Sequence, residues 1–153
     1  MSFKYQIRPI KSSDLPELIE LCRLHAEFEK SDYKGDHKAE ALAKHLFAES
    51  PSLYGLVVEG ESQLFGYCTF MPQFATWDAE FYLYMDCLYI RAEARSKGIG
   101  EALIERIKME AVSLKCKTIQ WQTPAFNKRA MKFYERLGAY GKDKVRYFLD
   151  VKT

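Results

Sequence analysis

One short segment combines glycines with basic side chains in an order suited to binding a phosphate. The run Arg95-Ser96-Lys97-Gly98-Ile99-Gly100 follows a long apolar stretch and opens a segment of helical periodicity. Glycine lets the backbone approach an anion closely, and the first turn of a helix presents unpaired N–H groups at the positive end of its dipole. Arg95 and Lys97 add positive charge where a pyrophosphate would lie. The segment therefore predicts a phosphate cradle.

Three kinds of phosphate site use glycine-rich turns of this sort, and their spacing separates them. A P-loop requires Lys and then Ser or Thr after its last glycine, whereas Glu101-Ala102 stands here. A dinucleotide fingerprint requires a glycine or alanine where Leu103 stands, and an acid about 20 residues later, near Gln120. The acyl-CoA pyrophosphate loop, Arg/Gln-x-x-Gly-x-Gly/Ala between a strand and a helix, is matched at every specified position. We therefore expect an acyl-CoA loop.

The elements that position this loop follow from the spacing of apolar residues. Strands are predicted at 5–10, with Pro9 indicating a sheet edge, and at 54–59, 63–70, 81–90, 118–122 and 144–151. Helices are predicted from a cap at Ser13 or Asp14 to about residue 26, over about 39–47 and 99–114, and from a cap at Asn127 to Leu137. The strand at 81–90 is apolar on both alternating faces, and one face is expected to carry Tyr82, Tyr84, Asp86, Leu88 and Ile90. The pattern predicts one mixed α/β domain over residues 1–153.

Composition excludes several function classes. The chain has 153 residues, of which 48% are apolar and 29% charged, so intrinsic disorder is excluded. A formal charge of +2 gives no electrostatic reason to expect a nucleic-acid partner. No apolar run is long enough to span a bilayer and the N-terminus lacks the apolar stretch of a signal peptide, so we expect a cytoplasmic protein without a membrane partner. No metal is expected, because no metal-binding spacing accompanies the scattered cysteines and histidines, Cys22, Cys68, Cys87, Cys116, His25, His37 and His45.

Two blocks of the sequence resemble the GNAT superfamily of N-acetyltransferases. Residues 88–100 are similar to its central strand and acetyl-CoA loop, and residues 127–139 to its second signature, Asn-x-x-Ala-x-x-x-Tyr-x-x-x-Gly. A closer resemblance is to the diamine (spermidine/spermine) and thialysine acetyltransferase branch, through residues 25–30, 74–77 and 82–86. The chain departs from that branch at Asp86-Cys87, where two adjacent acids are common, and at Ala92 and Ala94, which replace a proline and an aromatic residue.

The resemblance implies a single GNAT domain, with a central, mostly antiparallel sheet flanked by helices. It implies transfer of acetyl from acetyl-CoA, the co-substrate, to a primary amine by direct attack in a ternary complex, and a homodimer. The amine would belong to a small molecule such as a polyamine or a lysine analogue. Two alternatives stay open: a protein or peptide amine as acceptor, and a non-catalytic acyl-CoA-binding module.

The resemblance also suggests roles for individual residues. Tyr134 would protonate the departing thiolate, since a phenol is protonated at neutral pH. Asp86 would accept the amine proton directly or through water, although a structural hydrogen bond explains it equally well. Glu27 and Glu29 would attract a cationic amine, and Trp77 would line the acceptor site unless it packs in the core or a dimer seam. The residues expected to bind acetyl-CoA are Leu88, Tyr89, Ile90, Arg95, Ser96, Lys97, Gly98, Ile99, Gly100, Glu101, Asn127 and Tyr134.

Overall fold

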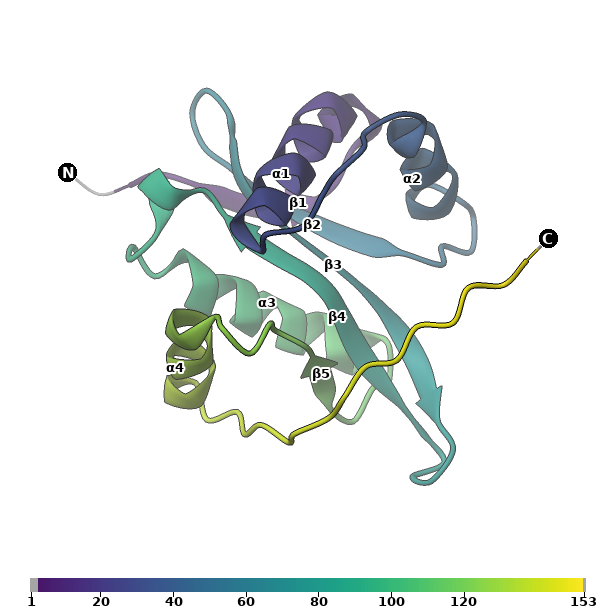
Figure 1. The fold of residues 1–153 in the computed structure, drawn as a ribbon. Coiled ribbons are helices and arrows are strands. Elements are labelled where there is room, and N and C mark those ends of the chain that lie inside the picture. Colours follow the sequence, from purple (N-terminus) through teal and green to yellow (C-terminus); the bar gives the residue numbers. More distant parts are fainter. Residues whose placement is uncertain (1–2, 153) are drawn as a thin grey trace. The chain divides into compact units, whose positions relative to one another are not determined.

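The computed structural model describes residues 3–152, in two compact units that divide between Gln122 and Thr123 (Figure 1). The first unit carries a five-stranded sheet of order β1-β2-β3-β4-β5, antiparallel except for the parallel pair β4–β5. The expected mixed α/β class with a mostly antiparallel sheet is confirmed. Its elements are β1 (Gln6–Pro9), the 3-10 turn η1 (Ser12–Asp14), α1 (Leu15–Phe28), α2 (Lys38–Leu46), β2 (Tyr54–Glu59), β3 (Leu64–Ala75), β4 (Glu80–Ile90), η2 (Ala92–Ala94), α3 (Ile99–Ser113) and β5 (Ile119–Trp121).

Helices cover both faces of this sheet. Figure 1 shows α1 and α2 on one face and α3 on the other. Leu18 and Leu21 of α1 and Leu46 of α2 share a buried cluster with Val57 of β2 and Tyr67 of β3. The other face is covered by the apolar stripe of α3, whose buried members are Ile99, Leu103, Ile104, Ile107 and Ala111. Within residues 3–152, no helix is long and apolar enough to cross a membrane.

A β-bulge interrupts β4 at Asp86. Thr69 of β3 pairs with Cys87 and Phe70 pairs with Met85, so Asp86 is the extra residue. Cys87 packs against the α1 cluster, whereas Met85 is buried outside it. Because a bulge shifts the alternation by one residue, the prediction of a single face from Tyr82 to Ile90 is wrong. The strand exchanges faces at Asp86, whose side chain remains exposed.

Strands β3 and β4 form an arm that is longer than predicted. β3 was expected to end at Phe70, but it continues to Ala75, where it pairs with Glu80 of β4. β2 leaves β3 at Phe70, so Pro72 stands where its missing N–H disrupts no ladder. The segment between Phe70 and Phe81 is therefore mostly hairpin rather than loop.

The second unit contains one helix, α4 (Lys128–Arg136). Asn127 caps it as expected, accepting a hydrogen bond from the N–H of Ala130 at 3.3 Å. Gly138 follows it with φ of +91°, the left-handed conformation of a residue that ends a helix. The predicted last strand is not present, because residues 139–152 have no regular structure. A strand requires a hydrogen-bonded neighbour, which this segment lacks within the described chain.

Arg8 holds the start of the chain together. Its guanidinium donates to both oxygens of Asp14, at 2.7 and 2.9 Å, and its Nε donates to Glu59. The Asp14 carboxylate also accepts the N–H of Lys11 at 2.7 Å. These contacts tie β1, β2 and the entry to α1 to one another, and the hydrogen bonds from Arg8 hold the pKa of the Asp14 carboxyl below its usual range.

We expect Asp14→Asn to lower the free energy of unfolding and also to reduce the loss of that free energy at acidic pH. A carboxyl whose pKa is lowered on folding stabilises the protein above its unfolded pKa, near 3.9, and this contribution is lost as the pH falls. At pH 7 the loss is expected to be about 2–3 kcal/mol, because a nearly buried Arg8 is left with one acid fewer. Urea unfolding at several pH values measures both effects. Glu105→Gln, in the exposed pair with Lys108, is the control, and equal losses for the two variants would contradict the prediction.

Candidate active site

The predicted phosphate cradle has the backbone of an anion site. Ser96 and Gly98 both adopt left-handed conformations, with φ of +62° and +80°, on either side of Lys97. Alternating conformations of this kind turn successive N–H groups toward one point. Gly98 is the N-cap of α3, and an added Cβ there would meet no atom within 4 Å. The space beside the helix N-terminus is therefore open to a ligand, which fits the pyrophosphate of acetyl-CoA.

The two cations of the loop have different surroundings. Arg95 donates from Nε to the carbonyl of Ile90 at 2.9 Å, and its guanidinium lies over the rings of Phe28, at 4.6 Å, and Tyr89, at 5.4 Å. Arg95 thus fastens the loop to the end of β4 and the end of α1. Lys97 lies 5.6 Å from the ring of Phe3. Neither cation forms an ion pair with an acid among residues 3–152, so their charge remains available to an anion.

One edge of β4 is unpaired beside this loop. The parallel pairing with β5 extends from Leu83 to Met85 and stops there, while β3 stays paired on the other side as far as Ile90. From Asp86 to Ile90, no strand of the described chain lies along the second edge. The predicted pantetheine-binding residues, Leu88, Tyr89 and Ile90, therefore present an open backbone edge between the bulge and the phosphate cradle.

Two of the predicted acidic residues have partners. Glu27 is exposed and pairs with Arg23 one turn earlier, at 3.1 Å, as ordinary helix-surface charges do. Glu29 accepts from Nε2 of His25 at 2.7 Å, and Nδ1 of His25 lies 2.7 Å from the hydroxyl of Tyr67. The structure thus joins Glu29 to the buried face of the sheet, whereas Glu27 stays on the surface of α1.

Thiols surround the hydroxyl of Tyr67. Cys22 of α1 and Cys87 of β4 both lie near it. Burial raises the pKa of the Cys87 thiol to about 12, and the nearby Asp86 carboxylate adds to the shift. Cys68 is also buried, which raises its pKa as well. These cysteines are protonated at neutral pH, and no group of three His, Cys, Asp or Glu side chains within residues 3–152 is arranged to hold a metal ion.

Trp77 does not lie beside Asp86 of its own chain. It sits in the turn of the β3–β4 arm and is 99% exposed. Glu80 and Asp86 are about 20 Å apart along β4, because a strand rises about 3.3 Å per residue. The structure therefore places Trp77 at the far end of the arm from the open edge.

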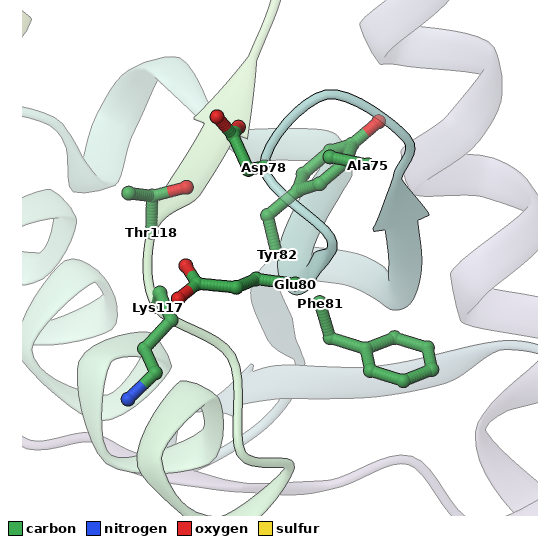
Figure 2. A pocket seen from close by; sticks show the side chains of 7 residues that line it. All are labelled: Ala75, Asp78, Glu80, Phe81, Tyr82, Lys117 and Thr118. Atoms are coloured by element: carbon green, nitrogen blue, oxygen red, sulfur yellow. The ribbon is translucent and has the colours of Figure 1, made fainter.

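A hollow of about 400 Å³ lies at the same end of the arm (Figure 2). Acidic Asp78 and Glu80 and basic Lys117 all contribute to its wall, along with Phe81 and Tyr82. This hollow is separated from the phosphate cradle by the length of β4, so it is distinct from the predicted acetyl site.

The remaining site residues belong to the second unit. The side chain of Asn127 caps α4, which explains this residue of the second signature without a ligand. Tyr134 lies in the last turns of α4, where its ring contacts that of Phe133. Both residues lie where the sequence predicted, Asn127 at the cap of the helix and Tyr134 within it.

No role in the site was predicted from the sequence for His25 or Tyr67. His25 and Glu29 are four residues apart on one helix, a spacing at which side chains meet, so their pairing was readable from the sequence. The contact with Tyr67 joins residues that are 42 positions apart, and only the packing of α1 on the sheet reveals it.

Comparison with known proteins identifies the family. The sequence model of the acetyltransferase (GNAT) family matches residues 17–139. The thialysine N-epsilon-acetyltransferase of Bos taurus is 32% identical over 87% of this chain and 82% of the relative. The D-amino-acid N-acetyltransferase HPA3 of Saccharomyces cerevisiae is 35% identical over 54% of this chain and 50% of the relative.

Solved structures share the fold at low sequence identity. A possible acetyltransferase from Clostridium difficile 630 superposes with a TM-score of 0.80 and 20% identity, over 97% of this chain and 99% of that one. An aminoglycoside N-acetyltransferase, AAC(6')-Iy in complex with CoA, does so with a TM-score of 0.81 and 14% identity, over 98% of this chain and 97% of that one. With the family match and the thialysine relative, these likenesses show that the chain belongs to the GNAT family of acetyl-CoA-dependent N-acetyltransferases.

Proposed function

We propose that this enzyme acetylates a primary amine of a small molecule. The observation that carries the proposal is the bulge, which exposes Asp86 immediately beside the open edge Leu88–Ile90. A carboxylate next to the acetyl-binding edge suits a cationic amine, and Glu29 adds a second acid at the end of α1. Relatives with named acceptors act on amino-acid amines: thialysine, D-amino acids and, in Arabidopsis thaliana, L-ornithine.

The proposed chemistry is direct transfer in a ternary complex. Acetyl-CoA supplies the acetyl group as a thioester. Asp86 takes the proton from the acceptor ammonium, directly or through water, and the neutral amine then attacks the thioester carbonyl. A backbone N–H in the Leu88–Ile90 stretch would stabilise the oxyanion, a contribution of roughly 3–4 kcal/mol in enzymes where such a donor has been removed. The C–S bond breaks, Tyr134 gives its proton to the thiolate, and the second proton that the nitrogen loses as the amide forms returns through water to Tyr134.

The strand edge, the acidic residues and the loop are proposed to bind different parts of the two substrates. We propose that the backbone from Leu88 to Ile90 pairs with the pantetheine arm. Glu29 and Asp86 attract the amine, while Glu27 contributes only long-range charge because it is paired with Arg23. The pyrophosphate would lie against the loop and the first turn of α3, formed by Arg95, Ser96, Lys97, Gly98, Ile99, Gly100 and Glu101, with Asn127 positioning Tyr134 through the cap of α4.

Release of CoA thiol from acetyl-CoA tests the function. We expect turnover with one or more small amines from a panel of thialysine, lysine, ornithine, D-amino acids, spermidine and an aminoglycoside. Short peptides with a free α-amine or a lysine form the comparison set. Turnover confined to peptides would favour a protein acceptor, and tight binding of acetyl-CoA without turnover of any amine would favour a non-catalytic binding module. Either result would contradict the proposal.

Tyr134→Phe is expected to lower kcat by about 10²–10⁴-fold, the usual contribution of one acid–base group. The KM for acetyl-CoA should change little, because the ring remains. Gly98→Ala is the contrasting variant: its Cβ occupies the open space of the cradle and strains a left-handed backbone, so it should raise the KM for acetyl-CoA. Circular dichroism checks that both variants fold. An unchanged kcat in Tyr134→Phe would remove Tyr134 from the acid role.

We also propose that the two units act as one N-acetyltransferase domain over residues 1–153, that the protein is cytoplasmic, and that it forms a homodimer. The four cysteines are free, which supports a reducing compartment. Support for the dimer comes from the C-terminal segment, where apolar and charged residues alternate as in a strand. Its apolar side chains are 71–92% exposed in the single chain, namely Val145, Tyr147, Phe148, Leu149 and Val151. A second copy that pairs with this segment would cover them.

Leu149→Asp is expected to weaken the dimer. In the single chain Leu149 is 92% exposed, so a charge there should leave the fold intact and act only where a partner covers the residue. Sedimentation velocity over a range of protein concentrations measures the association. Met109→Asp, at a 68% exposed position on α3, is the matched control. A wild-type protein that stays monomeric at the highest concentrations, or an unchanged dimer in Leu149→Asp, would contradict the proposal.

A further inference from the structure

A chain of hydrogen-bonding side chains begins at Glu29 and enters the sheet. The Glu29 carboxylate lies 2.7 Å from Nε2 of His25, and Nδ1 of His25 lies 2.7 Å from the hydroxyl of Tyr67. The side chain of Glu29 is 34% exposed and that of His25 13%, while Tyr67 is fully buried. The chain therefore leads from the surface at the end of α1 to the interior.

The chemistry of the two ends sets the direction of these hydrogen bonds. A carboxylate accepts and does not donate, so Nε2 of His25 carries the hydrogen. In the neutral ring Nδ1 is then an acceptor, and the hydroxyl of Tyr67 donates to it. Burial raises the pKa of Tyr67, which keeps the phenol protonated as this arrangement requires.

The inner end of this chain lies close to Asp86. The thiol of Cys87 is near the hydroxyl of Tyr67, and Sγ of Cys87 lies 3.8 Å from the Asp86 carboxylate. Glu29 and Asp86, the two acids proposed to meet the acceptor amine, are thus the ends of one series of contacts that crosses α1, β3 and β4. His25 is the link that joins its helical and sheet portions.

We propose that His25 is a positioning residue for the acceptor amine. It holds the Glu29 carboxylate in one place at the C-terminal turn of α1 and ties that turn to the strands that carry Tyr67 and Asp86. A carboxylate that is already fixed loses less freedom when it binds an ammonium group, so binding is tighter. This inference rests on the proposed function, because it assigns Glu29 to the amine that the enzyme acetylates.

The groups around His25 are Glu29 on its own helix, Tyr67 from β3, and the stacked ring of Tyr89 from β4 at 5.3 Å, over which Arg95 lies. Cys22 and Cys87 lie near the hydroxyl of Tyr67.

The test compares His25→Leu, which removes both hydrogen bonds, with His25→Gln, whose amide can still donate and accept. In His25→Leu we expect the KM of the best amine to rise about 5–10-fold, the scale of one ordinary hydrogen bond. kcat and the KM for acetyl-CoA should stay within about twofold. His25→Gln should recover part of the affinity. His45→Leu, which removes a contact of α2 with Ser52, is the matched control and should leave the KM unchanged.

A double-mutant cycle with Glu29→Gln separates positioning from packing. If His25 acts through Glu29, the double variant His25→Leu/Glu29→Gln should bind the amine no more weakly than Glu29→Gln alone.

The outcomes distinguish this inference from the proposed function. If the wild type acetylates no small amine, the proposed function fails. If it acetylates one and His25→Leu leaves the amine KM unchanged, the positioning role alone is overturned. A parallel fall in kcat and in both affinities would show a merely structural histidine, and would also overturn it. Calorimetric titration of the amine into each variant without acetyl-CoA gives a binding readout that does not depend on turnover.

Discussion

The single extra residue at Asp86 is the constraint on which the site depends. Without a bulge, β4 would keep one face toward α1 and the other toward α3 along its whole length. With it, Met85 is buried away from the α1 cluster while Cys87 and Tyr89 pack within it. The displaced backbone also coincides with the end of the β5 pairing. An exposed carboxylate and an open strand edge therefore arise from one local irregularity.

Backbone groups form one half of the proposed site, and side chains form the other half. The phosphate cradle consists of backbone groups held in shape by left-handed residues and by the fastening of Arg95 to Ile90. The proposed acceptor side consists of side chains, whose positions depend on α1 packing against β3 and β4. Since the formal charge of the chain is only +2, attraction for either substrate must come from these local groups rather than from the field of the whole protein.

The sequence predicted best what depends on neighbouring residues. The cradle at residues 95–100, the cap at Asn127 and the left-handed Gly138 are local, and the structure has all three. The bulge was not predictable, because it is set by how β3 pairs with residues 85–87 and an acid within a strand does not by itself indicate a bulge. The extension of β3 through Pro72 likewise depends on where β2 ends. The strand predicted at 144–151 from its alternating pattern was wrong, because alternation alone does not supply the strand that such a segment must pair with.

The burial of Cys87 has a consequence for acyl chemistry. A thioester reacts with thiolates as well as with amines, and a cysteine beside the acetyl-binding edge would be a competing nucleophile. Cys87 immediately precedes that edge, but burial and the charge of Asp86 raise its pKa to about 12, so the reactive thiolate is scarce at neutral pH. The carboxylate proposed to prepare the amine for attack thus adds to the effect of burial on the pKa of the neighbouring thiol. Selectivity for nitrogen over sulfur would follow chiefly from the burial of Cys87, with a smaller contribution from Asp86.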